Sequence, residues 1–180
     1  MNFKVSNIKI AFTCNSEELR ARQSVKCKVK HYSNFSVLKL TFTYIIFWSS
    51  GYINVTKLKT KKDISSARIE IEELFKIKLH EKFDIHNIFS SGQINLHIHS
   101  LYWIYKNIEV NSKKVLYLSF YPDLRIMCRK GTIIIFQSGK VTILGCKSFE
   151  NLSELYSKCA SIQTQLSPLK TKLSVKIVDS

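Results

Sequence analysis

The chain has 180 residues, of which 45% are hydrophobic. This length and composition suit one ordinary domain, or two small halves that share a core, and exclude a disordered protein. The 28 lysines and arginines stand against 13 acidic residues, and the formal charge of +15 favours nucleic acid or an anionic membrane surface as a partner. An A·T-rich genome also enriches lysine and isoleucine, so the charge alone leaves codon usage as an alternative explanation.

The five cysteines are odd in number and irregular in spacing, which argues against a disulfide framework and for a reducing compartment. Cys27 and His31 are spaced like a pair of metal ligands, but no second Cys/His pair matches that spacing. We therefore interpret the cysteines as strand and core residues and expect no metal or cofactor. The N-terminus lacks a signal-peptide pattern and no apolar run reaches membrane-spanning length, so we expect a soluble, intracellular protein that does not bind membranes.

The first half of the chain alternates in a way that predicts strands around a short helix. Apolar residues alternate from Phe3 to Thr13, and Asn15 then offers a cap for a short helix to about Gln23. Further strands are expected at 25–33, where lysines alternate with apolar residues, and at 35–42. A hairpin at 43–60 turns at Gly51, and a helix follows with one apolar stripe: Ile64, Ala67, Ile71, Leu74, Phe75 and Leu79.

The second half repeats this order. A strand is expected at 84–90, a short helix within 94–107, and strands at 115–120 and 124–128. A hairpin follows, with strands at 132–137 and 140–144 joined by a two-residue turn at Ser138 and Gly139. The last helix carries another apolar stripe: Phe149, Leu152, Leu155, Tyr156, Cys159 and Ile162. The segment after Pro168 is predicted to be either an added strand or a basic tail.

Both hairpins are apolar on both faces, whereas an antiparallel hairpin usually keeps one face in water. The following helix can cover only one side of each hairpin. We expect it to cover Ile45, Phe47, Ile53 and Val55 in the first copy and Ile133, Ile135, Val141 and Ile143 in the second. The opposite faces would then present Ile46, Trp48, Asn54 and Thr56, and Ile134, Phe136, Thr142 and Leu144. Such exposed apolar faces predict an interaction surface.

The two hairpins align without gaps when Gly51 is laid on Gly139, so the chain is predicted to be a tandem repeat. Asn7 and Asn87 support this alignment, because each lies between apolar residues in the first strand of its copy. We expect a first repeat at 1–82, a second repeat at 83–166, and a C-terminal tail or added strand at 167–180.

The stretch IIIFQSGKVTILGCK, the long helix after it and the two asparagine-containing strands resemble the core of the TATA-box-binding protein family. The resemblance covers Asn2 to Leu166 and is similar in style to such proteins of large DNA viruses or a fast-evolving protist. It implies an α+β saddle in which two pseudo-symmetric repeats form one curved antiparallel sheet with helices on the convex face.

The resemblance also implies roles for single residues. Trp48 and Phe136 match the aromatic wedges that enter between base pairs, and Phe35 and Tyr121 match their partners on the neighbouring strands. Asn7 and Asn87 match the asparagines that bind base edges at the centre of the site. The remaining candidates for groove contact are Ile46, Thr56, Phe89, Ile134, Thr142 and Leu144. The family has valine at the positions of Lys9, Asn54 and Thr142, and threonine at that of Leu144.

We therefore expect a transcription initiation factor that binds A·T-rich double-stranded DNA in the minor groove as a monomer, bends it, and recruits RNA polymerase or TFIIB-like factors. Its expected location is the nucleus, or a cytoplasmic viral factory if the source is a virus. Two alternatives stay open: a protein-interaction module of a transcription complex without DNA binding, and an accessory domain of a DNA-processing enzyme. No catalytic motif is present in the sequence, so we do not expect an enzyme.

Overall fold

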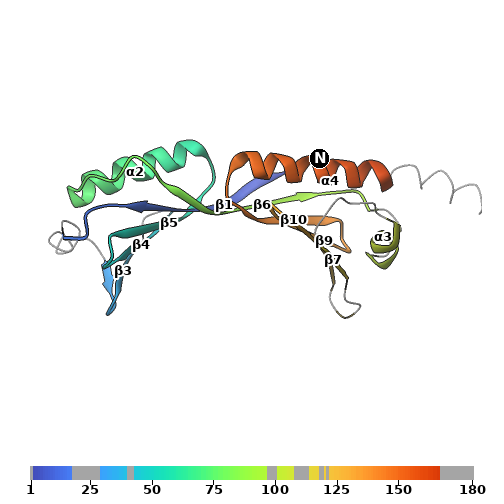
Figure 1. The fold of residues 1–180 in the computed structure, drawn as a ribbon, viewed down its shortest axis with the longest axis horizontal. Coiled ribbons are helices and arrows are strands. Elements are labelled where there is room, and N and C mark those ends of the chain that lie inside the picture. The colour runs from blue at the N-terminus through green and yellow to red at the C-terminus, as the bar shows by residue number, and fades with distance from the viewer. Residues whose placement is uncertain are drawn as a thin grey trace, which may run out of the picture. The chain divides into compact units, whose positions relative to one another are not determined.

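The computed structural model describes residues 2–17, 29–39, 43–96, 101–107, 114–117, 120 and 122–166. The chain forms two compact units, each built from strands and helices (Figure 1). The N-terminal unit consists of Val5–Ile88, and the C-terminal unit consists of Met1–Lys4 together with Phe89–Ser180. Most of the short helix expected to run to Gln23, and the segment after Pro168, lie outside the described residues.

The described part of the N-terminal unit is an antiparallel sheet with one long helix. Its strands are hydrogen-bonded in the order β2-β3-β4-β5-β1. The elements are β1 (Lys4–Thr13), β2 (Val29–His31), β3 (Phe35–Lys39), β4 (Tyr44–Trp48), β5 (Tyr52–Leu58) and α2 (Lys61–Phe75). Figure 1 shows α2 along one side of these strands, and none of the described helices of this unit lies on the other side.

Alternation along β4 and β5 decides which side chains α2 covers. Ile45, Ile53 and Val55 are fully buried, and Phe47 is 1% exposed and contacts the ring of Phe75 in α2, with 4.4 Å between ring centroids. Burying one such side chain contributes about 1.5–3 kcal/mol, so this layer is the core of the unit. The predicted face assignment for the first hairpin is confirmed.

Helix α2 begins and ends at local signals. The Thr60 side chain accepts from the Asp63 N–H at 3.1 Å, and the Asp63 carboxylate accepts in return from the Lys59 and Thr60 N–H groups at 2.8 and 3.0 Å, which is a capping box. The helix ends at Phe75 because Lys76 adopts a left-handed conformation, with φ of 51°. Leu79, expected on the helical stripe, therefore lies beyond the helix, although it is buried.

The C-terminal unit has the same plan. Its strands follow the order β6-β10-β9-β8-β7. The elements are β6 (Asp84–Gln93), β7 (Lys114–Tyr117), β8 (Asp123–Cys128), β9 (Gly131–Phe136), β10 (Lys140–Cys146), α3 (Leu101–Asn107) and α4 (Phe149–Leu166). Helix α4 covers Ile133, Ile135, Val141 and Ile143, all fully buried, so this face assignment is also confirmed. Of the range 94–107 predicted to contain the short helix, Leu101–Asn107 is helical and 94–96 is not, whereas 97–100 lies outside the described residues.

The second hairpin differs from the prediction in its connection. Strand β9 ends at Phe136 and β10 begins at Lys140, so three residues join them instead of two. Gly139 has φ of 79° and donates its N–H to the Phe136 carbonyl at 2.8 Å, which closes the longer turn. Gly139 also leaves no room for a side chain, because a Cβ there would clash with the carbonyl of Ile94.

The two glycines of the aligned hairpins accept equivalent backbone hydrogen bonds. The carbonyl of Gly51 accepts from the Cys14 N–H at 3.1 Å, and the carbonyl of Gly139 accepts from the Ile94 N–H at 2.9 Å. Cys14 and Ile94 each follow the first strand of their repeat. Each glycine therefore ties its hairpin to the end of the first strand of the same unit, as the aligned sequences lead one to expect.

The described cysteines lie within the packed units as thiols and not as disulfides. Cys14, Cys146 and Cys159 are buried and Cys128 is half-buried. Burial raises the pKa of Cys146 to about 11 and that of Cys159 to about 12, so both stay protonated at neutral pH. Cys27 of the candidate metal pair lies outside the described residues.

Two adjacent residues of β4 test the face assignment. Phe47→Ala should reduce the free energy of unfolding by about 3–5 kcal/mol, because it empties a core site. Trp48→Ala should cost about 1 kcal/mol, because Trp48 is 36% exposed and loses mainly its contact with Phe35. Urea unfolding of both variants measures the difference, and a larger loss in Trp48→Ala would invert the faces.

The capping box predicts an acid dependence of stability. The Lys59 N–H, with help from Thr60, holds the pKa of Asp63 below its ordinary value. A carboxyl group whose pKa is lower in the folded state stabilises the fold at neutral pH, and that contribution is lost as the pH falls through its folded pKa, below about pH 4. Asp63→Asn should lose a small part of the unfolding free energy at pH 7 and change less than the parent protein between pH 5 and pH 3. Equal acid dependence of both proteins in urea unfolding would contradict this.

Candidate nucleic-acid interface

The uncovered face of the N-terminal unit carries cross-strand rows of apolar and aromatic residues. Phe35 of β3 lies opposite Trp48 of β4. A second row runs through Val37, Ile46, Asn54 and Ala11, and a third through Lys39, Tyr44 and Thr56. Most of these side chains are half-buried, whereas their strand neighbours are buried under α2. The rows therefore form one face that no described helix of this unit covers.

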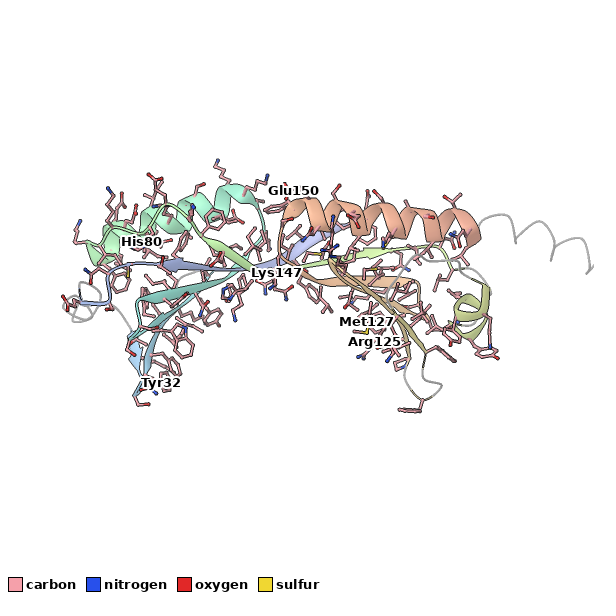
Figure 2. The ribbon with its side chains drawn as sticks, in the orientation of Figure 1. Tyr32, His80, Arg125, Met127, Lys147 and Glu150 are labelled. Carbon is pink, nitrogen blue, oxygen red and sulfur yellow. The ribbon has the colours of Figure 1, made fainter. Side chains whose placement is uncertain are left out.

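Three aromatic rings stack at one end of this face. Tyr32 lies 4.6 Å from Phe35 with the ring planes 16° apart, and Phe35 lies 5.2 Å from Trp48, measured between centroids. Two backbone bonds hold the rings together: the Tyr32 N–H donates to the Phe35 carbonyl at 2.8 Å, and the Ser49 N–H donates to the Asn34 carbonyl at 3.2 Å. Tyr32 is 53% exposed and points away from the side of His80 and α2 (Figure 2).

Tyr32 was not among the predicted site residues. The signal was present in the sequence, because Tyr32 and Phe35 flank Ser-Asn, a pair typical of turns. A turn at this point brings both rings to the same side of the sheet. Sequence reasoning placed Tyr32 inside a longer strand and missed the turn.

Lysines surround the ring of Tyr44 on the same face. The Lys57 ammonium lies 4.3 Å and the Lys39 ammonium 5.9 Å from the ring centroid, both within the range of cation–π attraction. These contacts hold two positive charges beside the apolar rows. The face thus combines aromatic groups that can stack on bases with cations that can contact phosphates.

Asn7 is fixed by a backbone bulge. The pairing of β1 with β5 shifts between Ile8 and Ile10, and Lys57 opposite this shift has φ of 70°. The Lys57 N–H donates to Asn7 Oδ1 at 2.6 Å. This bond identifies the amide oxygen and leaves the Asn7 NH₂ group as the part that can donate to the acceptors of a base edge.

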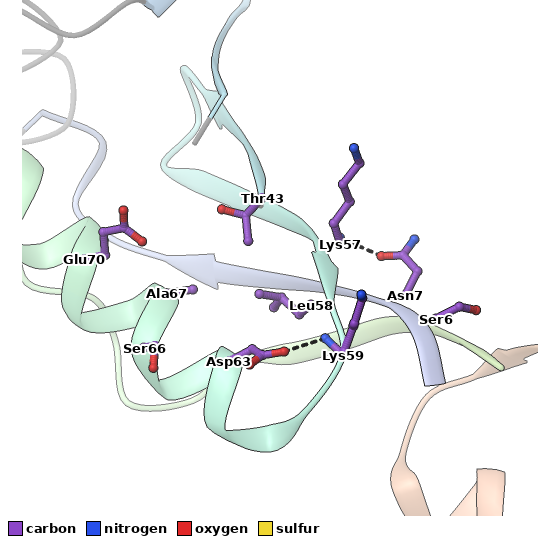
Figure 3. Close-up of a pocket in the computed structure, with 10 residues that line it drawn as sticks. All are labelled: Ser6, Asn7, Thr43, Lys57, Leu58, Lys59, Asp63, Ser66, Ala67 and Glu70. Carbon is purple, nitrogen blue, oxygen red and sulfur yellow. Dashed lines mark hydrogen bonds between the residues drawn. The ribbon is translucent and has the colours of Figure 1, made fainter. Parts of the chain in front are cut away.

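A cavity of about 880 Å³ lies beside Asn7, where β5 leads into α2 (Figure 3). Its walls come from β1, β5 and the first turns of α2, and they include both Lys57 and Glu70. The Asp63 carboxylate in this wall already accepts the two N–H groups of the capping box. Among the predicted site residues, Asn7 alone lines this cavity, and Lys57 in its wall also lies over the ring of Tyr44 in the third row.

The uncovered face of the C-terminal unit is built differently. Ile134 lies between Thr142 of β10 and Arg125 of β8, and Phe136 lies opposite Asp123. Arg125 donates from Nε and Nη2 to the two carboxylate oxygens of Asp123, at 3.0 and 3.1 Å. Figure 2 shows Arg125 and Met127 on the side away from α4, which carries Glu150. An ion pair thus lies beside Phe136, where the N-terminal unit has an aromatic stack.

Asp123 and Arg125 were also absent from the predicted site. Period-two alternation in the segment DLRIM already places Arg125 in phase with the uncovered face, so the signal was available. The ion pair depends on the cross-strand register, which local sequence does not determine.

The predicted site residues take the following places. Phe35, Ile46, Trp48 and Thr56 lie on the uncovered face of the N-terminal unit, and Ile134, Phe136 and Leu144 lie on that of the C-terminal unit. Thr142 shares this face but is only 7% exposed, so it offers less surface than expected. Asn87 and Phe89 lie on β6 and are half-buried. Tyr121 lies outside the described residues.

Within the described ranges, no group of three or more His, Cys, Asp or Glu side chains is arranged to hold a metal ion. None of the helices found there is long and apolar enough to cross a membrane. The chemistry that the two faces offer is stacking, apolar contact, hydrogen bonding and attraction of anions.

Comparisons with known proteins agree with this architecture. Residues 82–166 match the family model described as transcription factor TFIID, or TATA-binding protein. Among solved structures, the TATA-binding protein of Methanococcus jannaschii matches with a TM-score of 0.67 and 20% sequence identity, covering 92% of this chain and 99% of that one. No curated protein sequence matches the chain.

The predicted α+β fold is confirmed by the structural match, which spans nearly the whole of both chains. The family match falls on the second repeat, which contains the hairpin motif most typical of the family. Residues 82–166 are thus similar to the TATA-binding protein family, and the chain has the fold of a TATA-binding protein.

Proposed function

We propose that this protein is a promoter-recognition factor that binds the minor groove of A·T-rich DNA and bends it. The observation that carries the proposal is an apolar, aromatic sheet face in each unit that no described helix of the same unit covers. A face of this kind on a protein with a formal charge of +15 suits a partner that is both anionic and open to apolar contact.

The A·T-rich minor groove has both properties. Its floor shows only the adenine N3 and thymine O2 acceptors, because the guanine amino group is absent. Ile46, Ile134 and Leu144 can approach such a floor closely, and Lys39 and Lys57 can meet phosphates at its edge. Trp48 and Phe136 would act as wedges that unstack base steps. Kinking of this kind is the known behaviour of the TATA-binding protein itself, so the bend is proposed from the likeness to that protein and not from the geometry of the two faces.

Asn7 and Asn87 complete the proposed site. The Asn7 oxygen is engaged by the Lys57 N–H, so its NH₂ group would donate to a base-edge acceptor. Asn87, at the corresponding place in the second repeat, would do the same. Bound to DNA as a monomer, the protein would recruit RNA polymerase or TFIIB-like factors, in the nucleus or in a cytoplasmic viral factory.

A second candidate function is a protein-interaction module without DNA binding. It is favoured by polar residues on the proposed DNA face, since Lys9 and Asn54 stand where the family has valine, and Arg125 is paired with Asp123. Covering a partly buried ion pair of this kind with bases costs free energy, whereas such ion pairs are common in protein–protein interfaces. The two candidates differ in whether purified protein binds duplex DNA.

Competition between duplexes tests the leading proposal. An A·T-rich duplex should compete at least tenfold better than a G·C-rich duplex of the same length, because the guanine amino group obstructs apolar contact with the groove floor. Raising the salt concentration should weaken both, with a slope of about −0.9 for each phosphate neutralised, and should preserve the preference. Gel-shift titrations measure both effects. Equal affinity for the two duplexes at every salt concentration would mean that the protein is attracted only to phosphates. Absence of binding to either duplex would favour the protein-interaction module.

The aromatic stack predicts a fluorescence signal. In a Trp103→Phe background, Trp48 is the sole tryptophan, and stacking on a base should quench its emission on addition of A·T-rich duplex. Tyr32→Ala should weaken DNA binding by about tenfold, since one base–aromatic stack contributes about 1–3 kcal/mol.

Two variants serve as controls for this experiment. Tyr32→Phe keeps the ring and should bind like the parent. Tyr102→Ala removes a tyrosine of equal exposure, 52%, from α3 of the other unit and should leave both affinity and quench unchanged. Quenching that is the same with A·T-rich duplex and with free phosphate would show that Trp48 does not stack on DNA.

A further inference from the structure

One buried polar atom on the uncovered face of the N-terminal unit has no partner. Asn54 Oδ1 is excluded from solvent and makes no hydrogen bond, the one such side-chain atom among the described residues. Buried polar atoms are nearly always satisfied in folded proteins, so an orphaned one calls for an explanation. A ligand group on this face could become its partner only if the amide turned so that the oxygen was accessible.

Asn54 stands at the centre of this face. It lies between Ile46 of β4 and Ala11 of β1, and its strand neighbours Ile53 and Val55 are fully buried on the α2 side. Asn54 as a residue is only half-buried, although its oxygen is inaccessible. The accessible part of Asn54 therefore does not include the amide oxygen.

Because the Asn54 oxygen has no hydrogen bond, the amide group can rotate without breaking one at that atom. A half-turn about the bond from Cβ to Cγ exchanges the oxygen and the NH₂ group, which have nearly the same size. At Asn7 this exchange would break the bond from the Lys57 N–H. At Asn54 no hydrogen bond to the oxygen is lost, because that atom has no partner.

The two orientations suit different base pairs. With the NH₂ group outward, Asn54 donates to the adenine N3 or thymine O2 acceptors of an A·T pair. With the oxygen outward, it accepts from the guanine amino group, the one donor that a G·C pair adds to the minor groove. A valine at this place, as in the family pattern, could satisfy neither group and would leave the guanine amino group without a partner.

We propose that Asn54 is a specificity-determining residue that lets this protein accept a G·C pair at one position of an otherwise A·T-rich site. The inference rests on the proposed binding of the minor groove. Under this proposal, the first repeat reads a base through a hydrogen bond to guanine, whereas an apolar side chain would exclude guanine. The ligand group recognised is the 2-amino group of guanine.

The test compares G·C with inosine·C, because inosine is guanine without its 2-amino group. Single A·T pairs along an A·T-rich duplex are replaced in turn by G·C or by inosine·C, and each affinity is measured at one fixed salt concentration. In the parent protein, at least one position should show nearly equal affinity for the two pairs. In Asn54→Val, the ratio of the dissociation constants at that position should rise about tenfold in disfavour of G·C.

Further variants separate the hydrogen bond from shape and folding. Asn54→Leu has nearly the shape of asparagine without its polar atoms and should raise the same ratio at the same position. Thr132→Val makes a similar polar-to-apolar change on β9 in the other unit and should leave the ratio at that position as in the parent. Thermal unfolding of each variant confirms that affinities are compared between folded proteins.

The outcomes are distinguishable. A parent protein that disfavours G·C tenfold or more at every position overturns the inference while the proposed function stands. Unchanged ratios in both Asn54 variants also overturn it, because another group must then accept the guanine amino group. A parent protein that binds no A·T-rich duplex overturns the proposed function and this inference together.

Discussion

The structure depends on one constraint: each unit has a sheet with two apolar faces, and its long helix covers one of them. Ile45, Ile53 and Val55 are fully buried because α2 covers them, and the alternate residues of the same strands have no such cover within the described residues. Burial on one side stabilises the unit by about 1.5–3 kcal/mol for each large side chain. The uncovered side chains contribute little to the stability of the unit, because they stay in contact with water. Alternate side chains of the same strands therefore either stabilise the fold or remain available for an interaction.

Period-two alternation predicted this division well, because the side-chain direction in a strand follows from backbone geometry alone. Trp48 and Phe47 fell on the expected faces, and the glycines of the two hairpins occupy equivalent places. The contacts of Tyr32 and Arg125 escaped prediction because they depend on a turn and on the register between strands, which local pattern does not give. The end of α2 depends on the left-handed conformation of Lys76, which a lysine does not predict.

The two repeats keep one framework and differ at the tips of their uncovered faces. The first has Tyr32, Phe35 and Trp48 in contact, and the second has Phe136 beside the ion pair of Asp123 and Arg125. A stack of rings offers a surface that any base can use, whereas a guanidinium held by a carboxylate offers directed donors. The two units thus present unlike chemistry at equivalent places of the same framework.

Asn7 and Asn54 belong to the same unit, but only the amide oxygen of Asn7 has a hydrogen-bond partner. The Lys57 N–H fixes the oxygen of Asn7, so the amide has one orientation and one kind of base acceptor to offer its NH₂ group. The oxygen of Asn54 has no partner, so nothing but packing sets its orientation. In the proposed complex with DNA, the engaged amide of Asn7 would offer one fixed hydrogen-bonding group, whereas the amide of Asn54 could offer either. Under that proposal, specificity on this face would depend less on which residues are polar than on whether the backbone has already used their hydrogen bonds.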